Sequence, residues 1–121
     1  MLVEKIFAAP TVSNAQALFW FDTRARVVDM NLQAAQMLRA EPGWLLMQDF
    51  FSLCGQNQPD PALLAEWQDI QHGRISGAEH ALIAANGAQI WVALAFSKRA
   101  AARSGDDDRI LALALNMDVF R

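Results

Sequence analysis

Two segments near the C-terminal end of the chain carry apolar residues on both faces of the strands that they are expected to form. The first, residues 89–97, alternates Ile90, Val92, Leu94 and Phe96 with Trp91, Ala93 and Ala95. The second, residues 109–117, alternates Leu111, Leu113, Leu115 and Met117 with Ile110, Ala112, Ala114 and Asn116. A sheet that is open to water on one side shows polar residues at alternate positions instead. These strands therefore require a sheet that is covered on both faces.

Three further segments are expected to belong to this sheet. Residues 17–22 form an aromatic-rich run that predicts a buried strand, and residues 27–30 return from the polar turn at 23–26 as the second strand of a hairpin. Residues 80–83 predict another strand. Asn86-Gly87 joins it to the next one, because Asn-Gly between two apolar strands is a strong hairpin signal.

Short helices are expected between the two groups of strands. Asn31 can cap the first of them, and Pro42 can open the second. Residues 49–54 add a further helical turn. The clearest helix begins at Pro61, and Gly73 closes it. Its apolar stripe consists of Leu63, Leu64, Trp67 and Ile70.

Strands at both ends of a chain with helices between them predict an α+β fold, here a five-stranded antiparallel sheet with short helices on one face. An additional short helix at residues 2–7 places Leu2, Val3, Ile6 and Phe7 on one side. Because the central helices can cover only one face of the sheet, this helix is expected to lie over part of the other. The chain is accordingly divided into an N-terminal cap helix at 1–13 and one domain at 14–121.

The composition suits a single domain that needs neither a metal nor a disulfide. Of the 121 residues, 54% are hydrophobic, which is enough to bury a core. The formal net charge is −3 and the ten Lys and Arg residues are scattered, which argues against nucleic-acid binding. Cys54 is the only cysteine and no apolar run could span a bilayer, so we expect a cytoplasmic domain in a reducing compartment. The chain can equally be a piece of a longer receptor.

The order of these elements, with several local motifs, resembles a PAS domain over roughly residues 17–119. Four stretches carry the resemblance: Phe21-Asp22 with Arg26 to Asn31, Trp67 to Gly73, Asn86 to Trp91, and Asn116 to Val119. They are similar to the family's first hairpin with its helix-opening Asn, its Trp-containing helix end, its Asn-Gly turn with an Ile-Trp strand, and the Asp-aliphatic exit from its last strand. Each motif alone is common, but their order and spacing are fairly specific.

The resemblance implies a sensory module that binds a small molecule or a partner, and not an enzyme. The most similar subgroup comprises the PAS modules of bacterial chemoreceptors and of redox or oxygen sensors, some of which hold flavin or haem. Three positions depart from the family pattern: Arg39-Ala40 replaces the usual Gly-Tyr, Ile75 replaces the Trp of many flavin-binding members, and Phe120 replaces a frequent Thr. We therefore expect no bound cofactor, with flavin and haem both disfavoured.

A candidate ligand cavity is expected between the sheet and the helices. Its residues are Asn31, Leu38, Trp67, Ile75, Trp91 and Asn116. Trp67 and Trp91 could flank a flat ligand, because indole offers a large face and one N–H donor, or they could simply pack in the core. Asn31 and Asn116 could contact a ligand, since a buried amide needs hydrogen-bond partners. Asn31 could equally serve only as a helix cap.

Catalytic and metal-binding motifs do not stand out. Cys54 lacks the motif that surrounds the reactive cysteine of light-sensing PAS relatives, so a buried or idle thiol is the simpler interpretation. His72 at a helix end and His80 in a strand are the only candidate haem ligands, and surface or capping roles suit both better. No Ser/His/Asp order, HExxH motif or phosphate-binding glycine loop occurs, so we expect no enzyme activity.

Two functions of different classes fit these features. In the first, a small molecule bound between sheet and helices changes the last strand, and Asp118 relays the change to an output domain downstream of Arg121. In the second, side chains fill the core and the domain serves only dimerisation or docking in a larger signalling protein. Small residues favour a cavity, namely Ala93, Ala95, Ala112 and Ala114. Four Trp and seven Phe residues favour a filled core instead.

A homodimer is expected in either case. The outer face of the sheet is apolar, and large contiguous apolar patches are uncommon on monomers. Closed two-fold symmetry is the commonest way to cover such a surface. The expected interface residues are Val3, Ile6 and Phe7 of the N-terminal helix and Leu113 of the last strand.

Overall fold

The computed structural model of the chain describes residues 16–100 and 108–120. The expected N-terminal cap helix, with Val3, Ile6 and Phe7, lies outside the described residues. The same holds for most of the loop before the last strand. The description below concerns the two described ranges.

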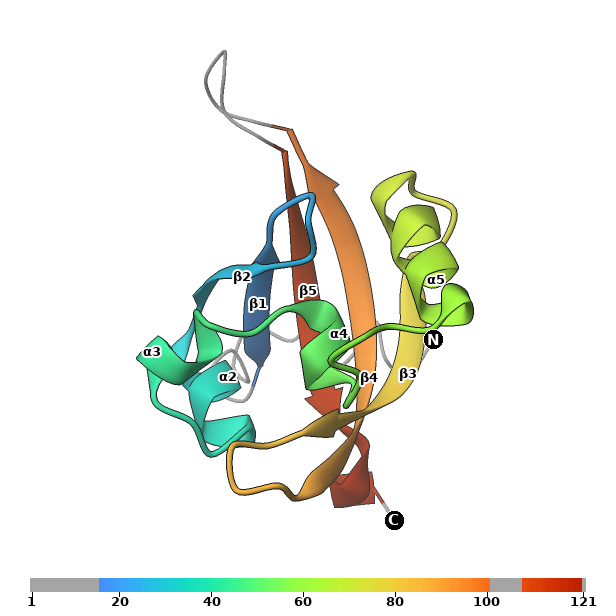
Figure 1. The fold of residues 1–121 in the computed structure, drawn as a ribbon. Helices are drawn as coiled ribbons and strands as arrows, with labels where there is room; N and C mark the ends of the chain where they lie inside the picture. The colour runs from blue at the N-terminus through green and yellow to red at the C-terminus, as the bar shows by residue number, and fades with distance from the viewer. Residues whose placement is uncertain (1–15, 101–107, 121) are drawn as a thin grey trace.

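The described strands form one antiparallel sheet, as the sequence predicts (Figure 1). They are β1 (Ala17–Phe21), β2 (Val27–Met30), β3 (Gly77–Ile83), β4 (Gln89–Arg99) and β5 (Arg109–Asn116). Their spatial order is β2-β1-β5-β4-β3, and every neighbouring pair is antiparallel. The two ends of the domain therefore meet where β1 pairs with β5. The predicted five-stranded antiparallel sheet is confirmed.

Short helices connect β2 to β3 and lie on one side of the sheet (Figure 1). They are α2 (Leu32–Met37), α3 (Pro42–Leu45), α4 (Phe50–Leu53) and α5 (Pro61–Gln71), and a 3₁₀ turn, η2 (Met117–Phe120), follows β5. The side chains of Asn31, Asp49 and Asp60 each accept a hydrogen bond from a backbone N–H in the first turn. At 11 residues, α5 is the longest described helix and falls well short of the about 20 that cross a bilayer.

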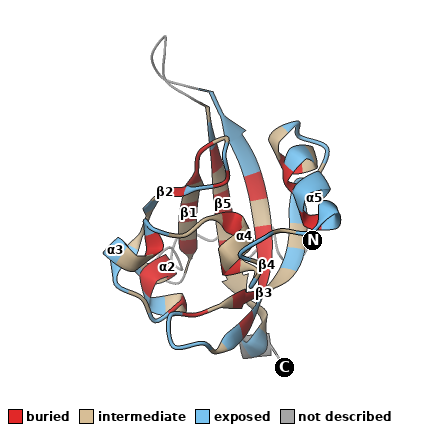
Figure 2. Cartoon of the chain, viewed as in Figure 1, coloured by how far each residue is buried: buried red, intermediate tan, exposed pale blue. Residues whose placement is uncertain are grey.

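Cross-strand pairing assigns each side chain to one face of the sheet. Phe19 on β1, Ala112 on β5 and Phe96 on β4 are direct neighbours in one row. Phe96 also contacts Phe50 of α4, with ring centroids 6.1 Å apart, so this row faces the helices. By their register, the buried residues of β1 and β5 belong to this side, and Figure 2 shows buried residues as red segments of the strands. The core therefore lies between the sheet and the helices.

The opposite face of the sheet, called the outer face below, is apolar as well. Its half-buried side chains are Leu18, Trp20, Leu111, Leu113 and Leu115. Ala93 and Ala95 also lie on the outer face, because they pair with its leucines on β5. The expectation that these two alanines leave room opposite the helices is wrong. Only Ala112 and Ala114 face the helices.

Candidate functional site

An aromatic cluster lies between the helices and the sheet. Phe50, the first residue of α4, is at its centre and is 1% exposed. Its ring centroid lies 5.2 Å from that of Trp67 on α5, 6.0 Å from that of Phe21 on β1 and 6.1 Å from that of Phe96 on β4. Such ring contacts each add about 0.5–1.5 kcal/mol beyond the burial of the rings. The interior beside α5 is therefore built from flat side chains that orient one another.

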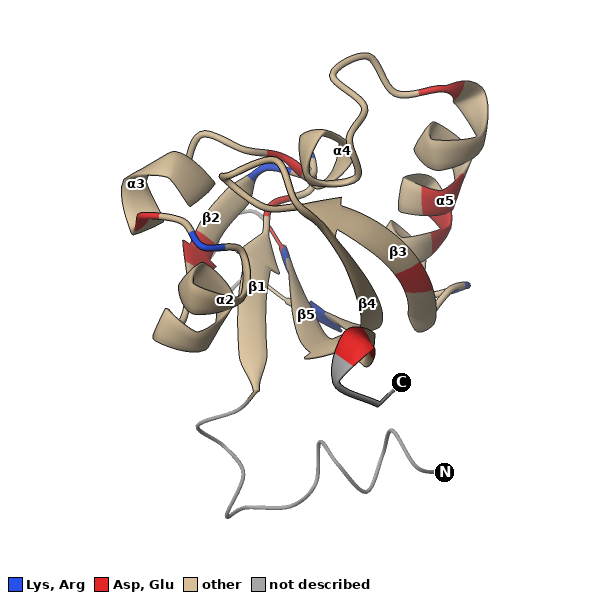
Figure 3. Cartoon of the chain, turned by 90° about the horizontal axis from the view of Figure 1, so that it is seen from below, with Lys and Arg blue, Asp and Glu red and all other residues tan. Residues whose placement is uncertain are grey.

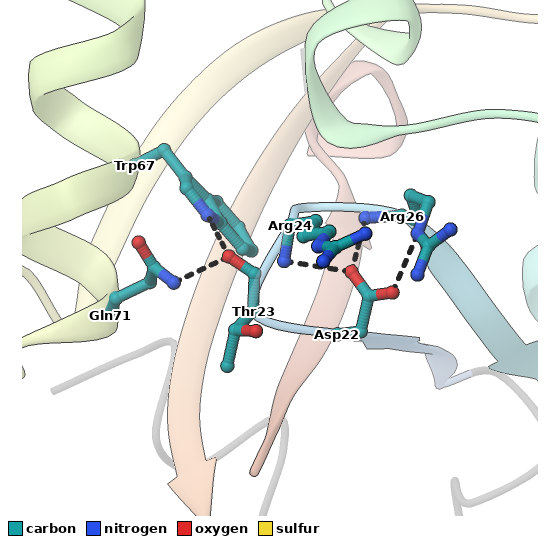
Figure 4. Close-up of polar contacts among 6 residues, drawn as sticks. All are labelled: Asp22, Thr23, Arg24, Arg26, Trp67 and Gln71. Carbon is teal, nitrogen blue, oxygen red and sulfur yellow. Dashed lines mark hydrogen bonds and ion pairs between the residues drawn. The ribbon is translucent and has the colours of Figure 1, made fainter. Parts of the chain in front are cut away.

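Trp67 is joined to the β1–β2 turn as well as to the cluster. Its indole Nε1 donates to the backbone carbonyl of Thr23 at 3.3 Å. Gln71, one turn further along α5, donates from Nε2 to the same carbonyl oxygen (Figure 4). The indole N–H is thus hydrogen-bonded and the indole ring is packed against other rings within the chain. This agrees with the core-packing interpretation of Trp67.

Asp22 fixes the conformation of the β1–β2 turn. Its Oδ1 accepts from the backbone N–H groups of Arg24 and Arg26, both at 2.9 Å, and its Oδ2 pairs with the Arg26 guanidinium at 2.8 Å (Figure 4). Asp22 is buried, and a buried carboxylate needs such partners. The carbonyl of Ala25 in turn accepts from the Phe50 N–H at 2.8 Å. The turn is therefore an ordered platform to which both α4 and α5 are bound.

Asn31 joins α2 to β1. Its Oδ1 accepts from the N–H of Ala34 at 2.9 Å and from the N–H of Leu18 at 3.0 Å. Its Nδ2 donates to the carbonyl of Gln16 at 2.9 Å. The amide thus uses three of its four hydrogen-bonding positions within the chain, in the capping role that the sequence left open. Leu38, at the other end of α2, is buried in the core.

Trp91 lies on the outer face of the sheet and not beside Trp67. It alternates with the buried Ile90 and Val92, and it is 37% exposed. Its Nε1 donates to Oε1 of Glu79 on the neighbouring strand at 2.9 Å. The expectation that the two tryptophans flank one flat ligand is therefore wrong, because the sheet separates them.

Ile75, Asn116 and Asp118 do not belong to the aromatic cluster. Ile75 is half-buried and packs against the core between α5 and β3. Asn116 pairs with the buried Val92, which places it on the helix side of the sheet at the end of β5. Its Oδ1 accepts from the N–H of the exposed Asp118 at 2.9 Å. The last strand thus leads directly into an exposed acidic residue.

The sequence did not indicate a second polar contact of α5. His80 of the edge strand β3 directs Nε2 to the carboxylate of Glu66 on α5, and its ring lies edge-on to Phe50, with centroids 5.5 Å apart. The position of Glu66 beside the apolar stripe of α5 is the signal that could have indicated this contact. His72, by contrast, is exposed, and its Nδ1 lies 2.7 Å from the carbonyl oxygen of Gln68 at the helix end.

Cys54 lies at the end of α4, near the carboxylate of Glu66. Burial raises the pKa of its thiol to about 12, and the negative charges of Glu66 and Asp49 add to the shift. Such a thiol is protonated at neutral pH and is therefore a poor nucleophile and metal ligand.

No three His, Cys, Asp or Glu side chains in the described ranges are grouped so that they could hold a metal ion. Acidic residues mark α5 and β3, whereas the central strands are largely uncharged (Figure 3).

Comparison with known proteins relates the chain to solved structures. No family model matches it, and no curated protein does. A PAS domain of a Desulfitobacterium hafniense protein gives a TM-score of 0.74 at 8% identity, covering 88% of this chain and 97% of that one. A domain of a sensory box sensor histidine kinase/response regulator from Geobacter sulfurreducens gives 0.70 at 19% identity, covering 96% and 97%. A LOV protein from Rhodobacter sphaeroides gives 0.65 at 18% identity, covering 84% and 58%.

These similarities concern the fold, because the identities are too low to carry function. The matched domains cover most of the described sheet and its helices. The strand order and the helices on one face agree with the resemblance that the four sequence motifs indicated. The chain therefore has the fold of a PAS domain.

Proposed function

We propose that this chain is the sensory domain of a signalling protein and binds a small molecule between the sheet and the helices. The proposal rests on the aromatic cluster around Phe50 and Trp67. β5, which pairs with β1 beside this cluster, would carry a change there through Asn116 and Asp118 to an attached output domain. The likeness in fold to a domain of a sensor histidine kinase supports this role.

The chemistry of the cluster favours a flat and uncharged ligand. Its interior is lined by aromatic rings, and the one buried carboxylate, that of Asp22 in the described ranges, is already paired with Arg26. A charge brought into such surroundings without a partner is strongly disfavoured. A flat aromatic ligand replaces ring contacts by others of the same kind.

Neither flavin nor haem is part of this proposal. His80 is engaged by Glu66, and His72 is exposed at the end of α5, so ligation of haem iron would require a histidine to leave its present contact. Ile75 stands where many flavin-binding PAS domains have Trp. A visible absorption band in protein purified without additives would contradict this expectation.

Titration with indole, a neutral flat probe, tests the proposed site by NMR. We expect saturable shifts of the backbone amide signals in the β1–β2 turn, α4 and α5, accompanied by shifts at Asn116 and Asp118. Indole-3-acetate is the matched charged probe and should bind at least roughly tenfold more weakly, because its carboxylate must be desolvated. Shifts confined to the outer face, or no saturable shifts with any neutral aromatic probe, would refute the ligand-binding proposal.

The outer face of the sheet favours a second function, homodimerisation. Leu113 lies at its centre, between Leu18 of β1 and Ala95 of β4. In this proposal a second copy covers that face, and Val3, Ile6 and Phe7 of each chain contribute to the interface. Dimerisation and ligand binding are compatible. In a pure interaction module, the dimer would form and the indole titration would show no binding.

The same proposal places the domain in the cytoplasm, with no nucleic-acid partner. Cys54 is partly buried and forms no disulfide, which suits a reducing compartment. The formal net charge of −3 disfavours binding to a polyanion.

A further inference from the structure

α5 contacts the rest of the domain through a single face. The buried residues of this helix are Leu63, Trp67 and Ile70. With 3.6 residues per turn, Glu66 and Gln71 lie on the two opposite flanks of this apolar stripe. Glu66 contacts His80 of β3, whereas Gln71, together with Trp67, reaches the β1–β2 turn. A narrow apolar stripe with a polar contact on either side thus attaches the helix.

Backbone hydrogen bonds distinguish α5 from α2 and α4. α2 is tied to the β3–β4 hairpin, because the Ala85 N–H donates to the Leu38 carbonyl at 2.9 Å. α4 is tied to the β1–β2 turn, because the Phe50 N–H donates to the Ala25 carbonyl at 2.8 Å. Residues 57–75, all within the described part of the chain, make no backbone–backbone hydrogen bond to the described residues outside that segment. α5 is therefore attached by side chains.

A glycine with positive φ lies near each end of α5. Gly55 has φ 84° and Gly73 has φ 74°, and a Cβ added at Gly73 would meet nothing within 4 Å. Arg74, the residue after Gly73, contacts α5 itself, since its guanidinium pairs with Asp69 at 2.8 Å. Glycine adopts such φ values without strain, so the backbone can change direction more easily at these two positions than at other residues.

We propose that α5 is a hinged lid, which the Glu66–His80 contact and the two side-chain bonds to the Thr23 carbonyl hold shut. Opening of this lid withdraws the indole of Trp67 from the aromatic cluster. It leaves a flat slot beside Phe50 and frees the Thr23 carbonyl oxygen. A flat aromatic molecule with an N–H donor fits both features, because it restores the ring contacts and the hydrogen bond. The ligand in this inference rests on the proposed function, whereas the lid rests only on the contacts of α5.

Amide hydrogen exchange of the full chain, followed by NMR, tests the lid without any ligand. The amides of α5 should exchange through a local opening, faster than those of β4 and β5 and with little dependence on denaturant. Glu66→Ala and Gln71→Ala should each raise the exchange rate of α5 roughly fivefold, the usual effect of one net hydrogen bond. The double variant should raise it about 25-fold if the two contacts act independently. The strand amides should keep their rates.

Gln68→Ala is the matched control for this experiment. Gln68 lies on the same helix, its side chain is exposed, and it belongs to neither contact. Its replacement should leave the exchange of α5 unchanged. Two results would overturn the lid. In the first, α5 of the unsubstituted chain exchanges as slowly as β4 and β5. In the second, the double variant accelerates exchange equally in all elements.

Indole binding to the same variants tests whether the lid controls access. If α5 must open before indole enters, the apparent affinity should rise by the same factor as the opening of α5, because a larger fraction of molecules is competent to bind. An unchanged affinity in the Glu66→Ala/Gln71→Ala variant would show that indole does not enter beneath α5. Absence of indole binding in every variant would refute the proposed class of ligand. The exchange rates of α5 would still show whether α5 opens as a lid.

Discussion

Arg39 has a backbone conformation that a side chain disfavours. It follows α2 with φ 52°, in the left-handed region, and the next residue, Ala40, donates its N–H to the Ala35 carbonyl at 2.9 Å. This is the usual way to end a helix, and glycine is the residue that adopts it without strain. The PAS pattern usually has Gly at this position, so the departure noted in the sequence has a local energetic consequence.

Arg39→Gly is expected to stabilise the domain. Removal of the Cβ relieves the left-handed strain, and the greater freedom of glycine in the unfolded chain offsets part of the gain. We expect the free energy of unfolding in urea to rise by about 0.5–1 kcal/mol. Arg39→Ala is the control, since it keeps the Cβ and should give no such gain. A glycine variant no more stable than the alanine variant would contradict this account.

Cys54 is expected to react slowly with thiol reagents. Its pKa of about 12 lies three units above the ordinary value of 9.0, so the folded chain has about a thousandfold less thiolate near pH 8 than the unfolded chain. Labelling with a disulfide reagent should therefore be much slower when the chain is folded than when it is unfolded. Glu66→Gln removes one of the negative charges and should speed labelling moderately.

The sign of the same shift also predicts a pH dependence. The folded state holds the proton of the Cys54 thiol more tightly than the unfolded state does. The contribution of this thiol to the free energy of unfolding is therefore present below pH 9.0 and is lost as the pH rises toward about 12. Cys54→Ala should therefore flatten the decline of unfolding free energy in that range. In the labelling experiment, a reaction of the folded chain as fast as that of the unfolded chain would show that the thiol is not buried as described.

The residues of the site were predictable only in part, for reasons of chain geometry. The periodicity placed Trp67 on the buried stripe of its helix, where the structure has it. Trp91 could not be placed, because its strand is apolar on both faces and the sequence does not say which face receives the helices. The role of Thr23 could not be predicted either, since it acts through a backbone carbonyl, which every residue has.

At the scale of elements, the side chain of Asn31 connects the start of α2 with β1. Asn31→Ala removes the helix cap and both side-chain bonds to the segment that begins β1. We expect the free energy of unfolding to fall by about 2 kcal/mol in urea. Asn31→Asp keeps the acceptor oxygen for Ala34 and Leu18 but loses the donor to Gln16, so it should lose about half as much. Equal losses in the two variants would show that the cap contributes little.

Helix starts were easier to predict than strand ends. Asn31, Pro42 and Pro61 identify the beginnings of α2, α3 and α5, because caps and prolines act locally. β3, however, begins at Gly77 and not at His80, because the long β4 supplies pairing partners for three more residues. Met117 was expected in the last strand, but it begins η2. The length of a strand depends on the strand with which it pairs, so it cannot be predicted from the sequence of one segment alone.

At the scale of the whole molecule, the outer face of the sheet carries the prediction of a dimer. The helices all lie on the other side, so the two apolar faces of β4 and β5 are covered differently (Figure 2). The sequence indicated that both faces need cover, but only the register of β1, β5 and β4 identifies which side chains share the outer one. Leu113 is at the centre of that set.

Leu113→Asp is expected to weaken dimerisation, because an aspartate at the centre of the outer face would lose its hydration in the interface. Sedimentation equilibrium at micromolar concentration should show a dimer for the intact chain and a shift toward the 13.4 kDa monomer for this variant. Ile6→Asp and deletion of residues 1–10 should act in the same direction without altering the sheet. Met47→Asp is the control, since Met47 is 83% exposed on the helix side and its replacement should leave the dimer intact. An intact chain that remains at 13.4 kDa would refute the dimer and leave the outer face without this partner.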